Sequence, residues 1–166
     1  MKTLQFLILI LLGSMTISCE EGVVSGGSGN NQDTLTDKWL VPKEKVFDGV
    51  PGKDGLPSID EPKFLDASQV EYLNSNDLVL GIKVGDQIRA YPHPVMNWHE
   101  IVNDSFDESH IAITYCPLTG TGIGWDRQIL GEVTTFGVSG LLYNSNLIPY
   151  DRLTESNWSQ MLNKGI

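Results

Sequence analysis

An alternation of apolar residues with a period of two is the feature that most constrains the fold of this chain. Between residues 78 and 84, one side of the pattern holds Leu78, Leu80, Ile82 and Val84. Successive side chains of a β-strand point to opposite faces, so this spacing predicts a strand with one buried face. Gly85-Asp86 follows and suits a two-residue hairpin turn with glycine first. The return strand is expected over 87–91 and ends at Pro92.

Further segments downstream have a strand-like pattern, and glycine-rich turns separate them. Strands are expected over residues 108–115, 122–126 and 132–138. Short helices are expected over 66–73, with Asp66 as the N-cap, and over 94–100. We therefore predict a mainly β domain, at the margin of the α+β class, in which antiparallel strands carry a few short helices.

The N-terminus has the composition of a secretion signal. Lys2 supplies a positive charge, and an apolar run over 6–12 follows it. The run is too short to cross a bilayer as a helix, which needs about 20 apolar residues. It fits the apolar region of a cleavable signal peptide over residues 1–18. The sequence Thr-Ile-Ser-Cys that ends at Cys19 resembles a bacterial lipobox, so Cys19 is expected to carry fatty-acyl chains such as palmitate. Ordinary cleavage that leaves a free Cys19 thiol is the alternative.

Residues 19–37 are expected to form a lipid anchor and a flexible tether, because glycine, serine and asparagine dominate this stretch. Two or three acyl chains make a stable membrane anchor. We therefore expect the protein in the bacterial cell envelope, bound to the lipid bilayer through Cys19. The periplasmic face and the cell surface both remain open, as does the oligomeric state. The folded domain is expected over 38–166.

The chain is strongly acidic, with a formal net charge of -10 at pH 7. Nucleic acids attract basic surfaces through their phosphates, so this composition argues against a nucleic-acid partner. A basic patch that binds anionic lipids is excluded on the same grounds. A small ligand or a metal ion remains a candidate partner.

A series of aromatic, glycine-containing and polar motifs runs through the second half of the chain. The motifs are Tyr91-Pro92, Asn97-Trp-His-Glu-Ile-Val-Asn-Asp104, Thr114-Tyr-Cys-Pro-Leu118, Thr135-Phe-Gly-Val-Ser-Gly140, Leu142-Tyr-Asn-Ser145, Tyr150-Asp-Arg152, Ser156 and Trp158-Ser-Gln160. Over roughly residues 60–160 they closely resemble the family called domain of unknown function 3179. The resemblance implies no particular activity, because the family is named for its unknown function.

The chain departs from the family pattern in two ways. Many members look like Cys-Pro-Leu-Cys at the thiol motif, whereas this chain has Thr119 at the fourth position. The family domain also usually continues well past Trp158-Ser159-Gln160. We therefore expect residues 38–166 to be the front part of the domain, an incomplete domain with an unpaired sheet edge.

Cys116 and His99 are the best candidates for a chemical site. A thiolate and an imidazole suit copper or zinc as ligands. The alternative is that Cys116 belongs to the core and that His99 hydrogen-bonds a loop. The polar residues expected around the pair are Glu100, Asn103, Asp104, Asp151, Arg152 and Gln160. The leading prediction is therefore an exported lipoprotein with a soft-metal site.

Two other functions are compatible with the same sequence. The first is a binding module without chemistry, in which Trp98, Trp125, Trp158, Tyr143 and Tyr150 line a groove for a carbohydrate or a peptide. The second is a thiol enzyme, with Cys116 as the nucleophile and His99 as the base. Glu100 and Asp104 are also candidates for an acid–base pair, although carboxylates beside loops are usually solvated or capping groups.

Overall fold

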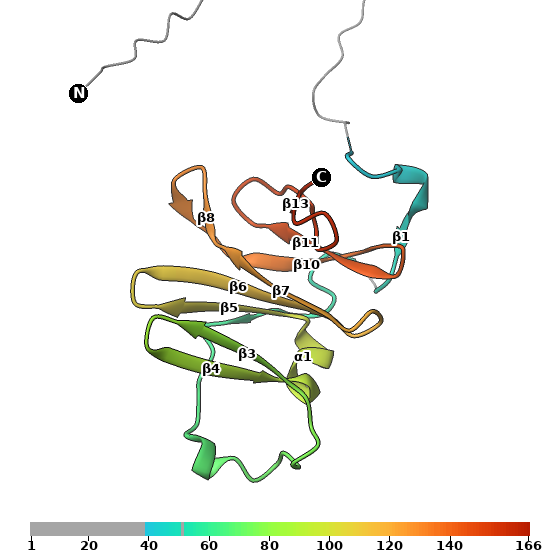
Figure 1. The fold of residues 1–166 in the computed structure, drawn as a ribbon. Helices are drawn as coiled ribbons and strands as arrows, with labels where there is room; N and C mark the ends of the chain where they lie inside the picture. Colours follow the sequence, from blue (N-terminus) through green and yellow to red (C-terminus); the bar gives the residue numbers. More distant parts are fainter. Residues whose placement is uncertain (1–38, 51) are drawn as a thin grey trace, which may run out of the picture. The chain divides into compact units, whose positions relative to one another are not determined.

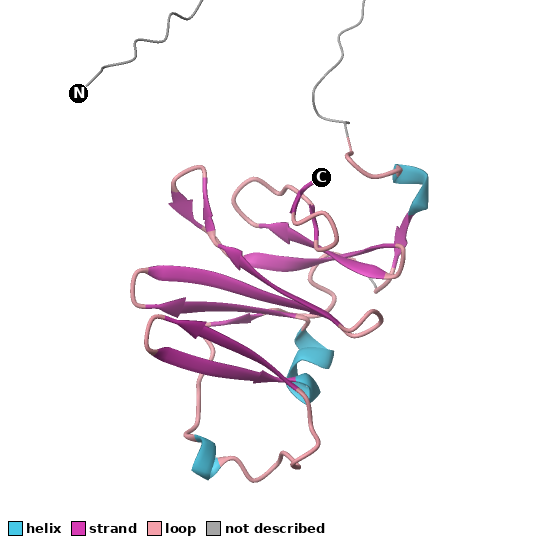
Figure 2. Ribbon diagram, in the orientation of Figure 1, coloured by secondary structure: helices cyan, strands magenta, loops and turns pink. Residues whose placement is uncertain are grey.

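The computed structural model describes residues 39–50 and 52–166, which form mostly β-strands (Figures 1 and 2). The strands are β1 (Val46–Asp48), β2 (Ile59–Asp60), β3 (Val79–Val84), β4 (Gln87–Pro92), β5 (Ile101–Phe106), β6 (Ser109–Cys116), β7 (Thr121–Asp126), β8 (Gln128–Ile129), β9 (Glu132–Val133), β10 (Phe136–Tyr143), β11 (Asn146–Asp151), β12 (Trp158–Ser159) and β13 (Lys164–Gly165). The prediction of a mainly β, largely antiparallel fold is confirmed. The predicted signal peptide, the predicted acylation site Cys19 and the tether to residue 37 lie outside the described residues.

The central sheet has the strand order β2-β5-β6-β7. The pairs β5–β6 and β6–β7 are antiparallel, whereas the short β2 runs parallel to β5. The predicted hairpin is present as β3 and β4, with Gly85 in the left-handed region at φ +57°. A second sheet has the order β1-β10-β11. Two short antiparallel pairs, β8–β9 and β12–β13, form separate two-stranded sheets.

Both faces of the central sheet are buried, because a separate apolar layer covers each one. The β3–β4 hairpin and helix α1 (His93–His99) lie on one side, and the β10–β11 sheet lies on the other (Figure 1). Ile113 and Tyr115 of β6 pack into the cluster on the hairpin side. Ala112 and Cys116 of the same strand pack into the opposite cluster, so alternate residues of one strand serve two cores.

The predicted helix over 66–73 is wrong in its extent. Only a single 3-10 turn forms there, η3 (Ala67–Gln69), and a capping box between Asp66 and Gln69 closes it. Val70 and Leu73 are only half-buried and no residue of the turn is buried, so little apolar burial is available to hold a longer helix. One more 3-10 turn, η2 (Lys43–Lys45), precedes β1. Among the described residues, no helix is long and apolar enough to cross a membrane.

The predicted strand over 132–138 is also wrong, because two strands of different sheets share this segment. β9 pairs with β8, whereas β10 begins at Phe136 and pairs with β1 and β11. All six residues of β11 are buried, yet no strand was expected there. Pro149 in its middle argues against a strand. It is tolerated because the register between β10 and β11 is interrupted next to it.

Candidate functional site

Cys116 lies at the end of β6 inside the protein, and its sulfur contacts the backbone of a neighbouring strand. The residue is 1 % exposed. Its Sγ atom accepts a hydrogen bond from the backbone N–H of Leu147 at 3.4 Å, and the thiol donates to the carbonyl oxygen of Ser145 at 3.5 Å. These contacts connect β6 to the start of β11, as expected for a core cysteine.

His99 is the last residue of α1, and its ring is bound to a loop. Its Nδ1 atom lies 2.8 Å from the carbonyl oxygen of Pro57. A carbonyl oxygen can only accept, so Nδ1 carries the proton in this hydrogen bond. The contact fixes the orientation of the imidazole against the segment that precedes β2.

The described residues do not provide the ligand set of a soft-metal site. Within 39–50 and 52–166, no group of three or more His, Cys, Asp or Glu side chains is placed to hold a metal ion. Zinc sites in proteins use three or four protein ligands. The Cys116 sulfur and the His99 Nδ1 atom are each engaged with backbone groups of different segments. A copper or zinc site at Cys116 and His99 therefore stays a prediction. The arrangement of the described residues does not favour it.

Asn103 and Arg152 belong to a polar network that joins the two sheets. The Asn103 side chain accepts from the backbone N–H of Phe136 at 2.8 Å and donates to its carbonyl oxygen at 2.8 Å. Asn103 also donates to Asp60 at 2.6 Å. Arg152 donates to the Phe136 carbonyl at 3.2 Å and lies 3.6 Å from the Asp60 carboxylate. These two predicted site residues thus connect β2, β5, β10 and the residue that follows β11.

Asp104 is engaged by two side chains of β4. Its carboxylate accepts from the Tyr91 hydroxyl at 2.6 Å and forms a salt bridge with Arg89. Burial and this hydrogen bond raise the pKa of Tyr91. Among the described residues no hydrogen bond joins Asp104 to Glu100, so the structure does not bring the proposed acid–base pair into contact.

Asp151 and Gln160 serve the packing of the C-terminal strands. Asp151 accepts from the backbone N–H and the hydroxyl of Thr154 and from the indole of Trp158. Burial raises the pKa of Asp151, but these hydrogen bonds outweigh that effect and keep the pKa below its ordinary value. Gln160 is 2 % exposed and donates to the Thr114 hydroxyl at 2.8 Å. Both residues therefore have their polar atoms satisfied inside the fold.

The predicted aromatic residues do not line one groove. Trp125 and Tyr150 are buried in the core, whereas Trp98 is 73 % exposed on α1. The Trp125 ring stacks on Phe136, with Trp158 edge-on to both. These rings fill the space between the central sheet and β10, which is a packing role.

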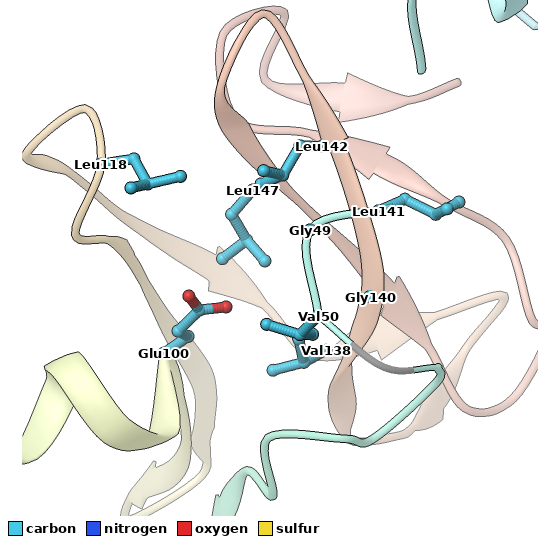
Figure 3. A pocket seen from close by; sticks show the side chains of 9 residues that line it. All are labelled: Gly49, Val50, Glu100, Leu118, Val138, Gly140, Leu141, Leu142 and Leu147. Atoms are coloured by element: carbon cyan, nitrogen blue, oxygen red, sulfur yellow. The ribbon is translucent and has the colours of Figure 1, made fainter. Parts of the chain in front are cut away.

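A small pocket lies beside the end of α1 and contains Glu100 as its charged side chain (Figure 3). About 280 Å³ of empty space lies at this pocket, and part of it is open solvent outside the mouth. The Glu100 carboxylate is directed into the gap between Leu118 on one side and Val50 on the other (Figure 3). The complete lining is Gly49, Val50, Glu100, Leu118, Val138, Gly140, Leu141, Leu142 and Leu147.

The backbone at the junction of α1 and β5 directs Glu100 into this pocket. Glu100 is the C-cap of α1 and has left-handed backbone angles, φ +57° and ψ -28°. Its N–H donates to the Met96 carbonyl at 2.8 Å, and its carbonyl accepts from the Tyr115 N–H at 2.7 Å. Glycine or asparagine is usual in this conformation, and other residues adopt it at a cost of about 1 kcal/mol.

The carboxylate of Glu100 is partly buried and has no protein partner among the described residues. No hydrogen bond or ion pair from residues 39–50 or 52–166 reaches it. Burial among apolar side chains raises the pKa of Glu100 from 4.5 to about 7. The group therefore changes its charge near neutral pH, and either form can hydrogen-bond a ligand.

A bulge in β10 builds one wall of the pocket. The register with β11 shifts after Val138, and Gly140 has φ +85°. The Gly140 carbonyl accepts hydrogen bonds from the N–H groups of Gly49 and Val50 at 2.8 Å and 3.3 Å. The bulge therefore brings the segment after β1 against the pocket.

The sequence named Glu100 as a polar residue around Cys116 and His99 and as a candidate acid–base partner of Asp104, and it missed the rest of the pocket. One local observation pointed to it, namely a glutamate at a helix end where glycine is common. The pocket adjoins the thiol motif, since Val138 and Leu147 of its lining belong to the same apolar cluster as Cys116. The Cys116 thiol thus lies behind the pocket wall.

Comparison with known proteins identifies the family of the chain. The model of a protein family of unknown function, DUF3179, matches residues 53–166. The chain matches no curated protein and no solved structure. The matched region includes Glu100, the β10 bulge and the network around Asn103, and it spans most of the chain. The resemblance in the motifs is thus confirmed, and the chain belongs to the DUF3179 family.

Proposed function

We propose that this chain is a ligand-binding protein of the bacterial cell envelope, that acylated Cys19 holds it to a membrane, and that the Glu100 pocket is its ligand site. One observation carries the proposal of a ligand site. An ionisable side chain points into an apolar pocket that opens to solvent, and no group among the described residues satisfies it. Its hydrogen-bonding capacity is therefore open to a ligand.

The position of Glu100 is unfavourable for folding in two independent ways. Its left-handed backbone is strained for a residue with a Cβ atom, and its carboxylate is partly desolvated with no protein partner among the described residues. Strained and desolvated groups concentrate at functional sites, where the surrounding structure holds them in place. The combination at one residue supports a binding role.

The composition of the pocket favours binding over catalysis. Every lining side chain other than Glu100 is aliphatic or is a glycine. A thiol enzyme would need the Cys116 sulfur at the surface, but the residue is 1 % exposed and its sulfur is hydrogen-bonded to backbone groups. A single carboxylate with apolar neighbours can orient a ligand without further chemistry.

Nuclear magnetic resonance on the isotope-labelled mature chain tests the ligand site. We expect small fragments that combine an aliphatic part with one polar group to shift the amide signals of Val138, Leu142 and Leu147. Glu100→Gln should weaken binding of the strongest fragment by a factor of about 3 or more, because an amide replaces the carboxylate. Fragments that shift only signals remote from the pocket would contradict the proposal.

Glu61→Gln is the matched control in this experiment. Glu61 also has a left-handed backbone, at φ +58°, but its side chain is exposed. The control therefore repeats the loss of one carboxylate at a strained position without touching the pocket. Fragment binding to this variant should equal binding to the unaltered chain.

Metabolic labelling with radioactive palmitate tests the membrane anchor. We expect a bacterial host that expresses the full chain to incorporate label, and Cys19→Ser to abolish it. Cys116→Ser serves as the control and should keep the label, because its thiol is not the acylated group in this proposal. Equal labelling of the Cys19→Ser variant would refute the anchor and leave the pocket untouched.

A further inference from the structure

We infer that the ligand of the Glu100 pocket carries a protonated primary amine on a short aliphatic chain, an inference that rests on the proposed function. The pocket pairs one carboxylate with walls of leucine and valine (Figure 3). A carboxylate accepts hydrogen bonds and attracts positive charge. The aliphatic walls suit methylene groups, whose burial is favourable.

The side chains of the pocket disfavour an anionic ligand. An anion needs hydrogen-bond donors, and no lining side chain has an N–H group. Five of the backbone N–H groups that border the pocket donate within the protein, to the carbonyls of Gly140 and Met96, the Ser139 hydroxyl and the Cys116 sulfur. These donors belong to Gly49, Val50, Glu100, Leu141 and Leu147. An anion would therefore meet apolar side chains and a repelling carboxylate.

Other cations fit the lining less well than a primary amine. Quaternary ammonium groups are recognised by aromatic side chains, and the pocket is lined by none. Calcium requires six to eight oxygen ligands, whereas one carboxylate is present. An ammonium group is a compact charge that forms one strong pair and keeps its other hydrogen atoms in contact with solvent at the mouth. The net charge of -10 also favours the approach of cations.

Three probes with four carbon atoms each separate the chemistry of the ligand from the existence of the site. These are n-butylamine, n-butanol and butyrate, titrated at pH 8 into the isotope-labelled mature chain. We expect n-butylamine to shift the signals of Val138, Leu142 and Leu147 with a dissociation constant on the order of 1 mM. Butanol should bind at least about tenfold more weakly, and butyrate should not bind.

Two variants identify the carboxylate as the group that recognises the amine. Glu100→Gln should weaken n-butylamine binding at least about tenfold and leave butanol binding unchanged, while Glu61→Gln should change neither. Leu118→Lys places an ammonium group at the rim of the pocket, where the native leucine is 68 % exposed. This internal cation should compete with n-butylamine and abolish its binding.

A fourth probe distinguishes the source of the amine. The blocked amino acid Nα-acetyl-lysine methylamide presents the same butylammonium end as part of a peptide. Tighter binding of this probe than of n-butylamine assigns the site to a lysine side chain, and weaker binding assigns it to a free alkylamine. Both results support the inference.

Different results would contradict the amine inference and the proposed ligand site. Butanol or butyrate that binds in the pocket as tightly as n-butylamine overturns the amine inference and leaves the pocket as a ligand site. Pocket signals that stay fixed with every probe and with the wider set of fragments overturn both proposals. Unchanged n-butylamine affinity in Glu100→Gln also overturns the amine inference.

Discussion

Replacing Gly140 with alanine should lower the free energy of unfolding by about 3 kcal/mol. Gly140 has φ +85°, and a residue with a Cβ atom is strained there by about 1–2 kcal/mol. A Cβ atom would also lie 2.6 Å from the carbonyl oxygen of Gly52 and 3.2 Å from that of Val50. These are backbone atoms that cannot rotate away, and such overpacking adds about 1–3 kcal/mol. Urea unfolding at pH 7 measures the change.

Gly131→Ala is the control that separates backbone strain from steric overlap. Gly131 also has φ +85°, but nothing lies within 4 Å of the Cβ position. We expect the free energy of unfolding of this variant to fall by only about 1 kcal/mol, the cost of backbone strain alone. Equal decreases in the free energy of unfolding of the two variants would show that steric overlap with Gly52 does not contribute to the effect of Gly140→Ala. Because the close approach of Gly52 to the β10 bulge shapes the pocket wall, Gly140→Ala should also lose the n-butylamine signal.

Replacing Glu100 with glutamine should stabilise the protein at pH 8 by about 2 kcal/mol. The folded state keeps an ionised carboxylate in an apolar pocket, whereas the unfolded state solvates it. A rise of the pKa from 4.5 to about 7 corresponds to at most about 3 kcal/mol. Solvent at the pocket mouth screens the charge and reduces this value. Most substitutions destabilise proteins, so a gain of this size at one polar residue is diagnostic.

The stabilisation should appear only as the pH rises. Below about pH 4 the carboxyl group is protonated in both states, and the two proteins should differ little. Between 4.5 and about 7 the unfolded chain releases the proton while the folded chain keeps it. The stability of the unaltered protein therefore falls with pH relative to the glutamine variant, and the difference levels off above about pH 7.

Urea unfolding of both proteins from pH 4 to pH 8 checks this profile. Glu61→Gln is again the control, because its exposed side chain leaves no desolvated carboxylate to remove. The free energy of unfolding of Glu61→Gln should change with pH in the same way as that of the unaltered protein. A pH-independent difference between Glu100→Gln and the unaltered chain would show that Glu100 is not desolvated in the folded state.

The two stability changes have opposite signs because they alter two parts of one pocket. Gly140 is a residue that the wall requires, whereas Glu100 is a residue that the fold would keep more easily as an amide or a glycine. A chain selected for stability alone would not place a glutamate there. The two measurements therefore test whether the fold keeps a destabilising carboxylate in a pocket that its own backbone is built to form.

Local sequence patterns were sufficient to predict the β3–β4 hairpin. The alternation over 78–84 and the turn at Gly85-Asp86 predicted β3 and β4, because a strand with one buried face and a tight turn are set by neighbouring residues. β11 could not be predicted in this way. Pro149 interrupts its pattern, and only its pairing with the bulged β10 makes the segment a strand.

The candidate site was predicted only in part, for a related reason. Glu100 and Cys116 were both named, but the sequence paired the cysteine with His99. In the folded chain, the Cys116 sulfur contacts Leu147, thirty-one positions away, and the His99 ring contacts Pro57. Spacing along the chain contains no information about such long-range contacts.

The sequence by itself determined the membership of the DUF3179 family, the mainly β class and the hairpin, because these depend on motifs and on periodicity over a few residues. Only the tertiary structure decided that Cys116 is enclosed between two sheets and that Glu100 faces a pocket. The pocket combines Val50, Leu118 and Leu142 with Glu100 from separate segments. The solvation of a charge depends on everything that surrounds it in space, and the tertiary fold alone sets those surroundings.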